Sequence, residues 1–510
     1  MNRILFNRSF QIKSGVKCFS TTLHRSAEEV VIVSATRTPI GSFRSSLSSL
    51  KAPELASVTI QALLEKSKIA KDAIDEVYLG NVLQGNIGQA PCRQAAIFAG
   101  LPTKTEATTI NKVCSSGMKA IMLAAQSLSL GHQKIMIAGG MESMSNAPFY
   151  MDRGDSPYGG VMLKDAILFD GLTDAYKSIH MGNCGENTAK KLGISREEQD
   201  QYAISSYKKS QEAAKRGDLA KEITPVTIKG KRGKPDTVIS EDEEYNKIDE
   251  KKFTSLRTVF QKENGTITAG NASKLNDGAA SCLLMTTSTA QKMNLTPLAR
   301  IVAFADGAVD PIDFPIAPVE ASKKLFNICD VKKEDVARWE INEAFSVVVL
   351  ANIKLLGLDP SKVNVNGGAV SLGHPIGMSG ARIVNSLALH LKPGEYGVAG
   401  ICNGGGGASS IMIQRLGNHE AETDKSLPLL TLYTKRNCGL CEEAKQKLKP
   451  YFKYVRYEEV DIEAPMNKKW FGLYRYEIPV FHFNGRFLMK NKGIDVNLLK
   501  NKLCQTNKLK

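Results

Sequence analysis

The sequence predicts a layered α/β fold that contains an internal duplication and is followed by a smaller α/β module. Short apolar runs rich in β-branched residues alternate with segments of helical periodicity, as in strands buried between layers of helices. This pattern recurs at an offset of about 260 residues, which indicates a duplicated unit. Residues 418–428 are polar and lack periodicity, which indicates a linker. The smaller α/β module is expected after it, over residues 429–505.

The first half is expected to span residues 29–297. It opens with V-V-I-V-S-A, a continuous apolar run typical of a strand that is covered on both faces. Strand patterns then follow at 74–82, 107–111 and 134–140, and helical patterns at 55–66, at 90–99 and from Cys114 through 128. Residues 141–265 break the alternation with many Gly, Pro and charged residues, so we expect an inserted loop domain there.

The second half, residues 298–417, repeats the order of the first. Apolar runs that begin at residues 298, 336 and 397 resemble the strands at 30–35, 74–82 and 134–140. Residues 364–391 are expected to form a strand, a glycine-rich turn around His374 and a helix, in the place that the turn at Cys114 takes in the first half. A duplication would bring these two turns together about a pseudo-twofold axis.

Composition and charge narrow the class of protein. Of the net charge of +15, residues 1–25 contribute five basic and no acidic residues, and residues 427–510 contribute 17 basic against 8 acidic residues. The nearly neutral main body argues against a nucleic-acid surface. No apolar run approaches the ~20 residues of a membrane span, and ten cysteines in 510 residues favour a reducing compartment over a disulfide scaffold.

The N-terminal segment, residues 1–28, has the composition of a mitochondrial transit peptide. Its basic residues are spaced among apolar and hydroxyl residues, and acidic residues are missing until Glu28. The alternative is a basic tail without a targeting role.

Three side chains suggest thiol acyl chemistry. His374 is flanked by glycines that allow a sharp turn close to a ligand, and a histidine held in this way is a candidate base. Cys114 opens a helix, where unpaired N–H groups and the helix dipole are expected to favour a thiolate. Cys402 enters a run of four glycines, whose backbone N–H groups can point at a developing oxyanion.

Four motifs carry a resemblance to a known family. N-K-V-C-S-S-G-M-K-A, N-E-A-F at 342–345, G-G-A-V-S-L-G-H-P-I-G-M-S-G-A-R and C-N-G-G-G-G-A-S stand in the order and spacing of the thiolase family, and the match spans about residues 29–416. The resemblance is closest to the acetyl-CoA acetyltransferases of mitochondria. It implies the duplicated thiolase fold (layered αβαβα) with a loop domain, a homotetramer in the matrix, and reversible condensation of two acetyl-CoA to acetoacetyl-CoA and CoA.

The resemblance also assigns roles to single residues. Cys114 would carry the acyl group and His374 would activate it, while Cys402 would move the α-proton of the second acetyl-CoA. Asn342 would stabilise the enolate oxygen through a water, and the backbone N–H groups of Cys114 and Gly404 would hold the thioester oxyanion.

The resemblance further implies binding positions. The expected coenzyme A contacts are Tyr207, Lys247, Asp249, Lys252 and Ser273. A potassium ion is expected at Tyr207 and at the carbonyls of Ala269, Gly270, Ala272 and Val370. Phe314 and Pro315 match positions that line a short acyl pocket, which predicts a preference for acetoacetyl-CoA and its 2-methyl derivative over longer chains.

The C-terminal module, residues 429–505, carries a C-x-x-C motif. Cys438 and Cys441 stand at the start of a helical pattern, after a strand, in the setting of a redox pair. The module resembles the glutaredoxin-like, thioredoxin-fold family, whose cis-proline would be Pro479, although the glycine pair expected for glutathione binding is missing. A metal-binding or inert module is the alternative.

Two alternatives concern the whole chain. A thiolase-fold protein that binds acyl-CoA or lipid without catalysis would have no need of two thiols and a base, and all of these are present. The two modules are also consistent with two neighbouring genes joined in one reading frame.

Overall fold

The computed structural model describes residues 28–417, except 156, 231 and 232, and residues 427–505, except 437, 465, 466, 492 and 493. The expected transit peptide and most of the expected linker lie outside these residues. The chain divides into two compact units, Met1–Leu416 and Gly417–Lys510. Within the described residues, no helix is long and apolar enough to cross a membrane.

The first half contains the elements that the apolar pattern predicts, each within a few residues of the expected bounds. They are β1 (Val30–Arg37), α1 (Ala52–Ser67), β3 (Glu76–Gly80), α2 (Pro91–Phe98), β4 (Glu106–Ile110), α3 (Ser116–Ser129) and β5 (Ile135–Ser143). The structure adds three elements that the sequence did not predict, β2 (Gly41–Ser42), β10 (Asn276–Thr286) and α8 (Thr287–Lys292). Every residue of β1 and of β5 is buried, as expected of strands that are covered on both faces.

The second half repeats this arrangement. Its elements are β11 (Ala299–Ala308), α9 (Ala317–Asn327), β12 (Val336–Ile341), α10 (Ser346–Leu356), α11 (Ala369–Leu372), α12 (Ile376–His390), β13 (Tyr396–Asn403) and β14 (Gly407–Arg415). The sheet has ten strands in the order β12-β13-β14-β11-β1-β10-β5-β3-β4, with β2 beside β10. Read outward from the β1–β11 pair, both halves have two antiparallel pairings followed by a parallel one, which confirms the predicted duplication.

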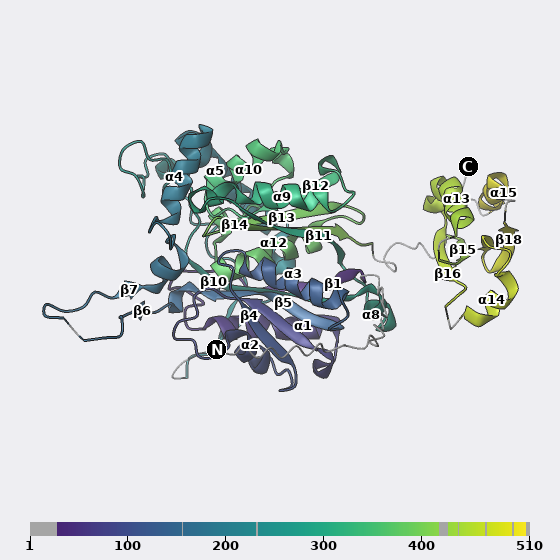
Figure 1. Ribbon diagram of the computed structural model, residues 1–510, viewed down its shortest axis with the longest axis horizontal. Coiled ribbons are helices and arrows are strands. Elements are labelled where there is room, and N and C mark those ends of the chain that lie inside the picture. The colour runs from purple at the N-terminus through teal and green to yellow at the C-terminus, as the bar shows by residue number, and fades with distance from the viewer. Residues whose placement is uncertain are drawn as a thin grey trace, which may run out of the picture. The chain divides into compact units, whose positions relative to one another are not determined.

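The helices form layers on the sheet. Helices α1 and α2 cover the outer face of the first half, α9 covers the second, and α3 and α12 pack together between the two halves (Figure 1). Glycines allow this central contact, because a Cβ on Gly117 would lie 2.8 Å from the carbonyl oxygen of Gly377, and one on Gly380 would lie 2.7 Å from the backbone nitrogen of Met118. The predicted αβαβα layering is thereby confirmed.

One expected element is wrong. The strand predicted before His374 is reduced to isolated bridges, Trp339 with Val363 and Val365 with Gly367, and the short helix α11 follows instead. The positive φ values of Asn364 (45°) and Gly367 (78°) explain this, because a residue in the left-handed region interrupts a strand.

The inserted region after β5 forms short strands and several helices, the longest with 20 residues, over one side of the main unit. They are β6 (Phe149–Tyr150), β7 (Lys164–Asp165), α4 (Met181–Leu192), α5 (Arg196–Lys215), α6 (Asp218–Glu222), β8 (Val226–Ile228), β9 (Thr237–Ile239) and α7 (Glu250–Phe253). The β6–β7 hairpin projects from the rest of the unit (Figure 1).

The C-terminal unit is a four-stranded sheet with helices. It contains β15 (Leu429–Thr434), α13 (Gly439–Leu448), β16 (Arg456–Asp461), α14 (Lys468–Tyr474), β17 (Val480–Phe483), β18 (Arg486–Lys490) and α15 (Val496–Gln505). The sheet order is β16-β15-β17-β18, with β15 and β16 parallel and the other pairs antiparallel. The α/β fold predicted for this module is confirmed.

Candidate active site

Cys114 lies in the tight turn between β4 and α3. The preceding residue, Val113, has a φ of 48°, a strained conformation for a β-branched residue that costs on the order of 1–3 kcal/mol. Ser115 directly precedes α3, and its hydroxyl proton is shared between the carbonyl of Ile401 (3.2 Å) and Oδ1 of Asn403 (2.9 Å). These two bonds fasten the Cys114 turn to β13, the strand that carries Cys402.

The two thiols lie close to each other at the junction of the two halves. Cys114 is 9% exposed and Cys402 is 1% exposed. The backbone N–H groups of Cys114 and Gly404 lie near the Cys114 sulfur and favour its charged form, and a charge on Cys114 disfavours a charge on Cys402. Two N–H groups directed at one point are the arrangement of an oxyanion hole.

Burial decides the protonation of these thiols. It raises the pKa of Cys114 to about 12, because desolvation outweighs the two backbone hydrogen bonds that favour the thiolate. The expectation of a thiolate at the helix start is therefore wrong. Burial and the neighbouring Cys114 also raise the pKa of Cys402. Both groups are neutral thiols, so nucleophilic attack requires a base.

His374 is oriented for that task. Ser379 Oγ donates to the carbonyl of Pro375 (2.9 Å) and therefore accepts from His374 Nδ1 (2.6 Å), which assigns the proton to Nδ1. Nε2, 3.5 Å from Nδ2 of Asn342, is left as the basic nitrogen. Burial, and then the charge of Arg382, lower the pKa of His374 to about 3, so the imidazole is neutral. Sequence reasoning missed Ser379, which stands five residues after the histidine.

Asn342 follows β12 and is fully buried. Its backbone N–H donates to the carbonyl of Gly400 (3.0 Å), which fixes it against β13. Its side-chain oxygen is buried and has no protein partner within the described part of the chain. This oxygen is available to hold a water or a substrate group beside His374.

Glu142, at the end of β5, interacts with groups near both the Cys114 turn and the His374 turn. Its carboxylate accepts from the backbone N–H groups of Val82, Leu83 (each 3.1 Å) and Gly377 (2.9 Å), and it interacts electrostatically with the Cys114 thiol. Burial raises the pKa of Glu142 to about 7. Sequence reasoning missed this residue, although a single carboxylate at the end of an apolar strand is a signal that could have found it.

A cleft of about 720 Å³ opens beside the segments that carry the two cysteines. Val113 and Gly404 line it from the main unit, and the inserted region contributes Tyr150, Phe169 and Met181. Phe314, 2% exposed, belongs to the same apolar cluster as Cys402 and Met181. The predicted acyl-pocket residue thus lies near the second thiol.

The predicted coenzyme A positions fall into two groups. Lys252 is 80% exposed at its side chain and pairs with Asp249 (3.2 Å), and Lys247 pairs with Glu244 (3.5 Å) and with Ser42. The backbone N–H of Ser273 donates to the carbonyl of Ala344 (3.0 Å). Exposed cations such as these are suited to the phosphate groups of a ligand.

Tyr207 differs from the other positions, because it is 4% exposed and packs with Phe253 and Val370. Its burial fits the predicted cation site better than a coenzyme A contact.

Three of the five predicted potassium ligands lie around the ammonium group of Lys274. Nζ of Lys274 donates to the carbonyl oxygens of Ala272 (3.0 Å) and Val370 (3.4 Å) and lies 5.4 Å from the ring centre of Tyr207. Desolvation lowers the pKa of Lys274 to about 8. Three of the five predicted positions therefore face a cation that the chain itself supplies. A potassium ion does not fit beside it, and we assign the ion no step.

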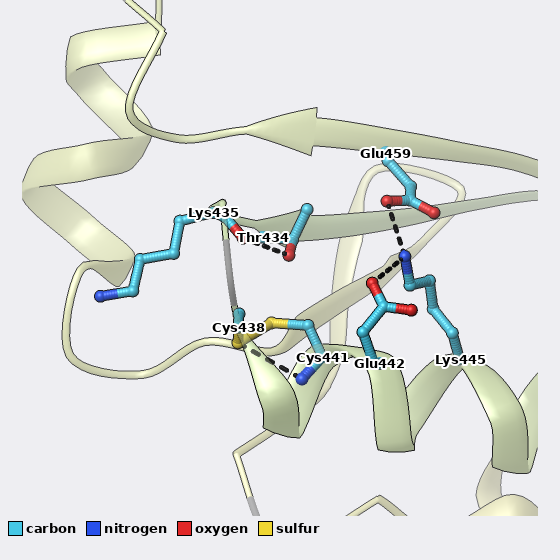
Figure 2. Close-up of a disulfide and its surroundings, with 7 residues drawn as sticks. All are labelled: Thr434, Lys435, Cys438, Cys441, Glu442, Lys445 and Glu459. Atoms are coloured by element: carbon cyan, nitrogen blue, oxygen red, sulfur yellow. Dashed lines mark hydrogen bonds and ion pairs between the residues drawn. A yellow bond between two sulfur atoms is a disulfide. The ribbon is translucent and has the colours of Figure 1, made fainter. Parts of the chain in front are cut away.

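The C-terminal unit holds a second cysteine site. Cys438 and Cys441 form a disulfide at the start of α13, and the N–H of Cys441 donates to Cys438 Sγ (3.3 Å) (Figure 2). Cys441 is 1% exposed and Cys438 is partly exposed. The peptide bond Ile478–Pro479 is cis, as the resemblance implied. Among the described residues, no group of three or more His, Cys, Asp and Glu side chains converges on a metal position.

Sequence reasoning missed the aromatic surroundings of this disulfide. Tyr433 shares an apolar cluster with Cys441 and lies 4.6 Å from Trp470 between ring centres. Tyr474 and His482 are joined by a hydrogen bond of 2.9 Å. Four aromatic rings from three elements meet only after the unit folds.

The comparisons with known proteins cover both units. The family of the thiolase N-terminal domain matches residues 30–288, that of the thiolase C-terminal domain matches residues 295–415, and a glutaredoxin-like domain matches residues 429–504. Acetyl-CoA acetyltransferase A, mitochondrial, of Xenopus laevis is 65% identical over 392 residues, which are 77% of this chain and 93% of that protein. The mitochondrial acetyl-CoA acetyltransferase of Homo sapiens is 64% identical over 389 residues, 76% of this chain and 91% of its own.

Solved structures agree with these relatives. The crystal structure of the Acat5 thiolase of Ascaris suum in complex with coenzyme A has a TM-score of 0.74 at 48% identity, and covers 76% of this chain and 100% of its own. The acetyl-CoA acetyltransferase of Bacillus anthracis has a TM-score of 0.74 at 39% identity, with 77% and 100% covered. The chain therefore belongs to the thiolase family, and it carries a glutaredoxin-like domain after the thiolase unit.

Proposed function

We propose that the thiolase unit is an acetyl-CoA C-acetyltransferase, which interconverts two acetyl-CoA with acetoacetyl-CoA and CoA. One observation carries this proposal: a neutral thiol, Cys114, has two backbone N–H groups near its sulfur and a second thiol, Cys402, beside it. The relatives that are 64–65% identical to this chain are named acetyl-CoA acetyltransferases. A protein that only binds acyl-CoA has no use for a paired thiol and an oriented imidazole.

The first half-reaction acylates Cys114. Nε2 of His374 takes the thiol proton as the sulfur attacks the thioester carbonyl, and the N–H groups of Cys114 and Gly404 bind the oxyanion. The tetrahedral intermediate then collapses and the carbon–sulfur bond to CoA breaks. The departing CoA thiolate takes the proton of Cys402. Acetyl-Cys114, imidazolium and the Cys402 thiolate remain, so charge is balanced.

The second half-reaction forms the carbon–carbon bond. The Cys402 thiolate takes a proton from the methyl group of a second acetyl-CoA, and the enolate oxygen is held beside His374 and Asn342. The carbanion attacks acetyl-Cys114, and the Cys114 thiolate leaves and takes back its proton from the imidazolium. Every group returns to its starting state, and acetoacetyl-CoA is released.

The acyl pocket should admit short chains. Phe314 is buried in the cluster that contains Cys402, so an added chain must displace an aromatic ring. A hydrophobic pocket discriminates by only about 1–3 kcal/mol per methylene, so one methyl branch is tolerated far better than four extra carbons. We infer thiolysis of acetoacetyl-CoA and of 2-methylacetoacetyl-CoA, and little of 3-oxooctanoyl-CoA.

Further properties rest on the relatives and on the motifs. Coenzyme A is substrate and product, with Lys247, Asp249, Lys252 and Ser273 as proposed contacts. The relatives named mitochondrial, together with the basic segment at the start of the chain, support a mitochondrial location, and we propose the matrix and a homotetramer. The domain bounds predicted from the sequence remain our proposal for how the chain divides.

The C-terminal domain is proposed to be a thiol-disulfide oxidoreductase. The disulfide at the start of α13, with partly exposed Cys438 and buried Cys441, is the arrangement in which one sulfur is attacked and the other resolves. Glutathione is not assigned as its reductant.

Trapping of the acyl-enzyme tests the main proposal. The protein is mixed with acetyl-CoA, quenched and mapped by mass spectrometry, as wild type, Cys114→Ala and Cys402→Ala. In wild type and in Cys402→Ala we expect acetyl on Cys114, and Cys402→Ala should lose condensation. Cys114→Ala should show neither acetylation nor condensation. Acetyl found on Cys402 with Cys114 unmodified reverses the two roles, and CoA release that persists undiminished in Cys114→Ala refutes the activity.

The chain-length inference is tested separately. The ratio kcat/KM is compared for acetoacetyl-CoA, its 2-methyl derivative and 3-oxooctanoyl-CoA. Phe314→Ala should raise the rate on the longest substrate relative to the shortest. Equal rates on all three in wild type would show that Phe314 does not limit the pocket.

A further inference from the structure

The ammonium group of Lys274 lies where three separate segments of the thiolase unit meet. It donates to the carbonyl of Ala272, in the turn before β10, and to the carbonyl of Val370, in α11. Its third contact is the face of the Tyr207 ring, on α5 of the inserted region. Two carbonyl oxygens and an aromatic face are acceptors that suit a cation of charge +1.

A buried carboxylate lies on the other side of α11. Glu343, fully buried, accepts from the backbone N–H of Val370 (3.0 Å) and from the hydroxyls of Ser206 (2.8 Å) and Tyr202 (2.7 Å). It also attracts the Lys274 ammonium electrostatically. Val370 is therefore held through its N–H by an anion and through its carbonyl by a cation.

The contacts of Lys274 and Glu343 with Val370 lie next to the turn that carries His374. Val370 is four residues before His374, and Glu343 directly follows Asn342 in the chain. A shift of α11 would move the imidazole relative to Asn342, whose Nδ2 lies 3.5 Å from Nε2. Such a shift of the imidazole would change the rate, because catalysis depends on the placement of reacting groups to within a fraction of an ångström.

We propose that Lys274 is a built-in monovalent cation, which ties α5, the turn before β10 and α11 together and makes the protein independent of potassium. The motif resemblance implies a potassium ion at the same carbonyls and ring, and two cations sharing these acceptors would repel each other. The covalently attached ammonium is present at every ion concentration. Lys274 is a positioning residue, because it acts on His374 only through α11.

The first test compares salts on the wild-type protein. Thermal unfolding and thiolysis are measured in potassium, sodium and choline chloride at equal ionic strength. We expect melting temperatures of the thiolase unit within about 1 °C and rates within about twofold of one another. Stabilisation by more than about 3 °C, or activation of more than about threefold, by potassium over both other salts would overturn the proposal.

The second test removes the internal cation. Lys274→Ala vacates the space at the two carbonyls, so we expect a lower melting temperature and a kcat lowered by about fivefold or more in choline chloride, both largely restored by potassium chloride. Lys323→Ala is the matched control, because Lys323 is an exposed lysine on α9 paired only with Glu320 among the described residues (2.9 Å). It should behave as wild type in every salt.

Two results for the variant would overturn the proposal: no change in any salt, or an equal loss in all salts. If Lys274→Ala does not fold, Lys274→Arg replaces it and should keep the salt independence of the wild type; a potassium requirement in Lys274→Arg counts against the proposal. The activity measurement rests on the proposed acetyl transfer, whereas the unfolding measurement does not. A salt response in unfolding thus separates failure of this inference from failure of the proposed function.

Discussion

The chain contains two cysteine pairs that are built in opposite ways. Cys114 and Cys402 come from different halves of the thiolase unit and meet as reduced, buried thiols. Cys438 and Cys441 come from one helical turn and are joined in a disulfide (Figure 2), and the residue Cys438 is partly exposed. In both pairs the first cysteine stands at or just before the start of a helix.

The difference teaches that a helix start does not by itself activate a thiol. The favourable interaction of a thiolate with a helix N-terminus is typically 0.3–1 kcal/mol at exposed sites, whereas complete burial shifts a pKa by up to several units. At Cys114 the effect of burial is larger and the pKa rises to about 12, so attack by this thiol requires a base, the role proposed for His374. Cys438 keeps contact with solvent and can exchange with an incoming thiol without a base of this kind.

The largest expected effect separates the two pairs by function. Cys114→Ala should lower thiolysis by at least about 10⁴-fold, since it removes the acyl carrier, and should leave disulfide exchange by the C-terminal domain unchanged. Cys438→Ser should do the reverse. Thiolysis of acetoacetyl-CoA and reduction of a dithiol-sensitive disulfide substrate are the two assays. A change of more than about threefold in thiolysis by Cys438→Ser would mean that the pairs are coupled.

Cys282→Ala is a matched control for the first variant. Cys282 is a fully buried thiol on β10 that donates to the carbonyl of Ala138 (3.5 Å) and has no proposed role in the reaction. Its loss should leave both assays near the wild-type rates.

A medium effect is expected when the base loses its orientation. Ser379→Ala removes the partner of His374 Nδ1 (2.6 Å), so kcat of thiolysis should fall by about 10- to 100-fold with little change in KM. Ser379→Thr, which keeps the hydroxyl, should recover part of the rate. Ser386→Ala, at a buried serine on the same helix, is the control. Equal losses in Ser379→Ala and Ser386→Ala would assign the effect to packing of α12.

A smaller effect is expected from pH. With the pKa of His374 lowered to about 3 and that of Cys114 raised to about 12, the resting enzyme keeps a neutral imidazole and a neutral thiol between these values. The ammonium of Lys274, whose pKa is about 8, also stays mostly charged up to pH 7, so the ratio kcat/KM for thiolysis should vary by less than about threefold from pH 5 to pH 7 and should fall above pH 8. Disulfide exchange at Cys438 should rise over the same range, because the attacking thiol must ionise. A bell-shaped thiolysis profile centred near pH 7 would contradict the burial argument.

The smallest effect is expected at the surface of the C-terminal site. Lys445 pairs with Glu442 and with Glu459 (3.4 Å) on α13 and β16 (Figure 2). Such surface pairs contribute about 0.2–1 kcal/mol, so Lys445→Ala should change the free energy of unfolding by less than about 1 kcal/mol and leave thiolysis unaltered. Chemical denaturation measures the first quantity. A loss above about 2 kcal/mol would show that the pair supports the disulfide region.

Much of the fold was accessible from the sequence, for reasons that particular elements show. The buried run expected at 30–35 is β1, Val30–Arg37, and the runs expected at 74–82 and 134–140 are β3 and β5. The strand expected before His374 failed because positive φ values at Asn364 and Gly367 do not appear in the apolar pattern. Of the candidate site, the motifs identified Cys114, His374, Asn342 and Cys402, whose assigned roles remain predictions.

By itself the sequence determined the order of the layers, the duplication and the two modules, and it identified the candidate reacting side chains, because these depend on local periodicity and on short motifs. Only the tertiary structure decided the protonation of the thiols, the partner of His374, the hydrogen bonds of Glu142 and the place of the Lys274 ammonium. Each of these depends on burial or on contact between segments far apart in the chain. The physical reason is that desolvation and hydrogen-bond partners are properties of the folded neighbourhood and cannot be read from a residue's neighbours in sequence.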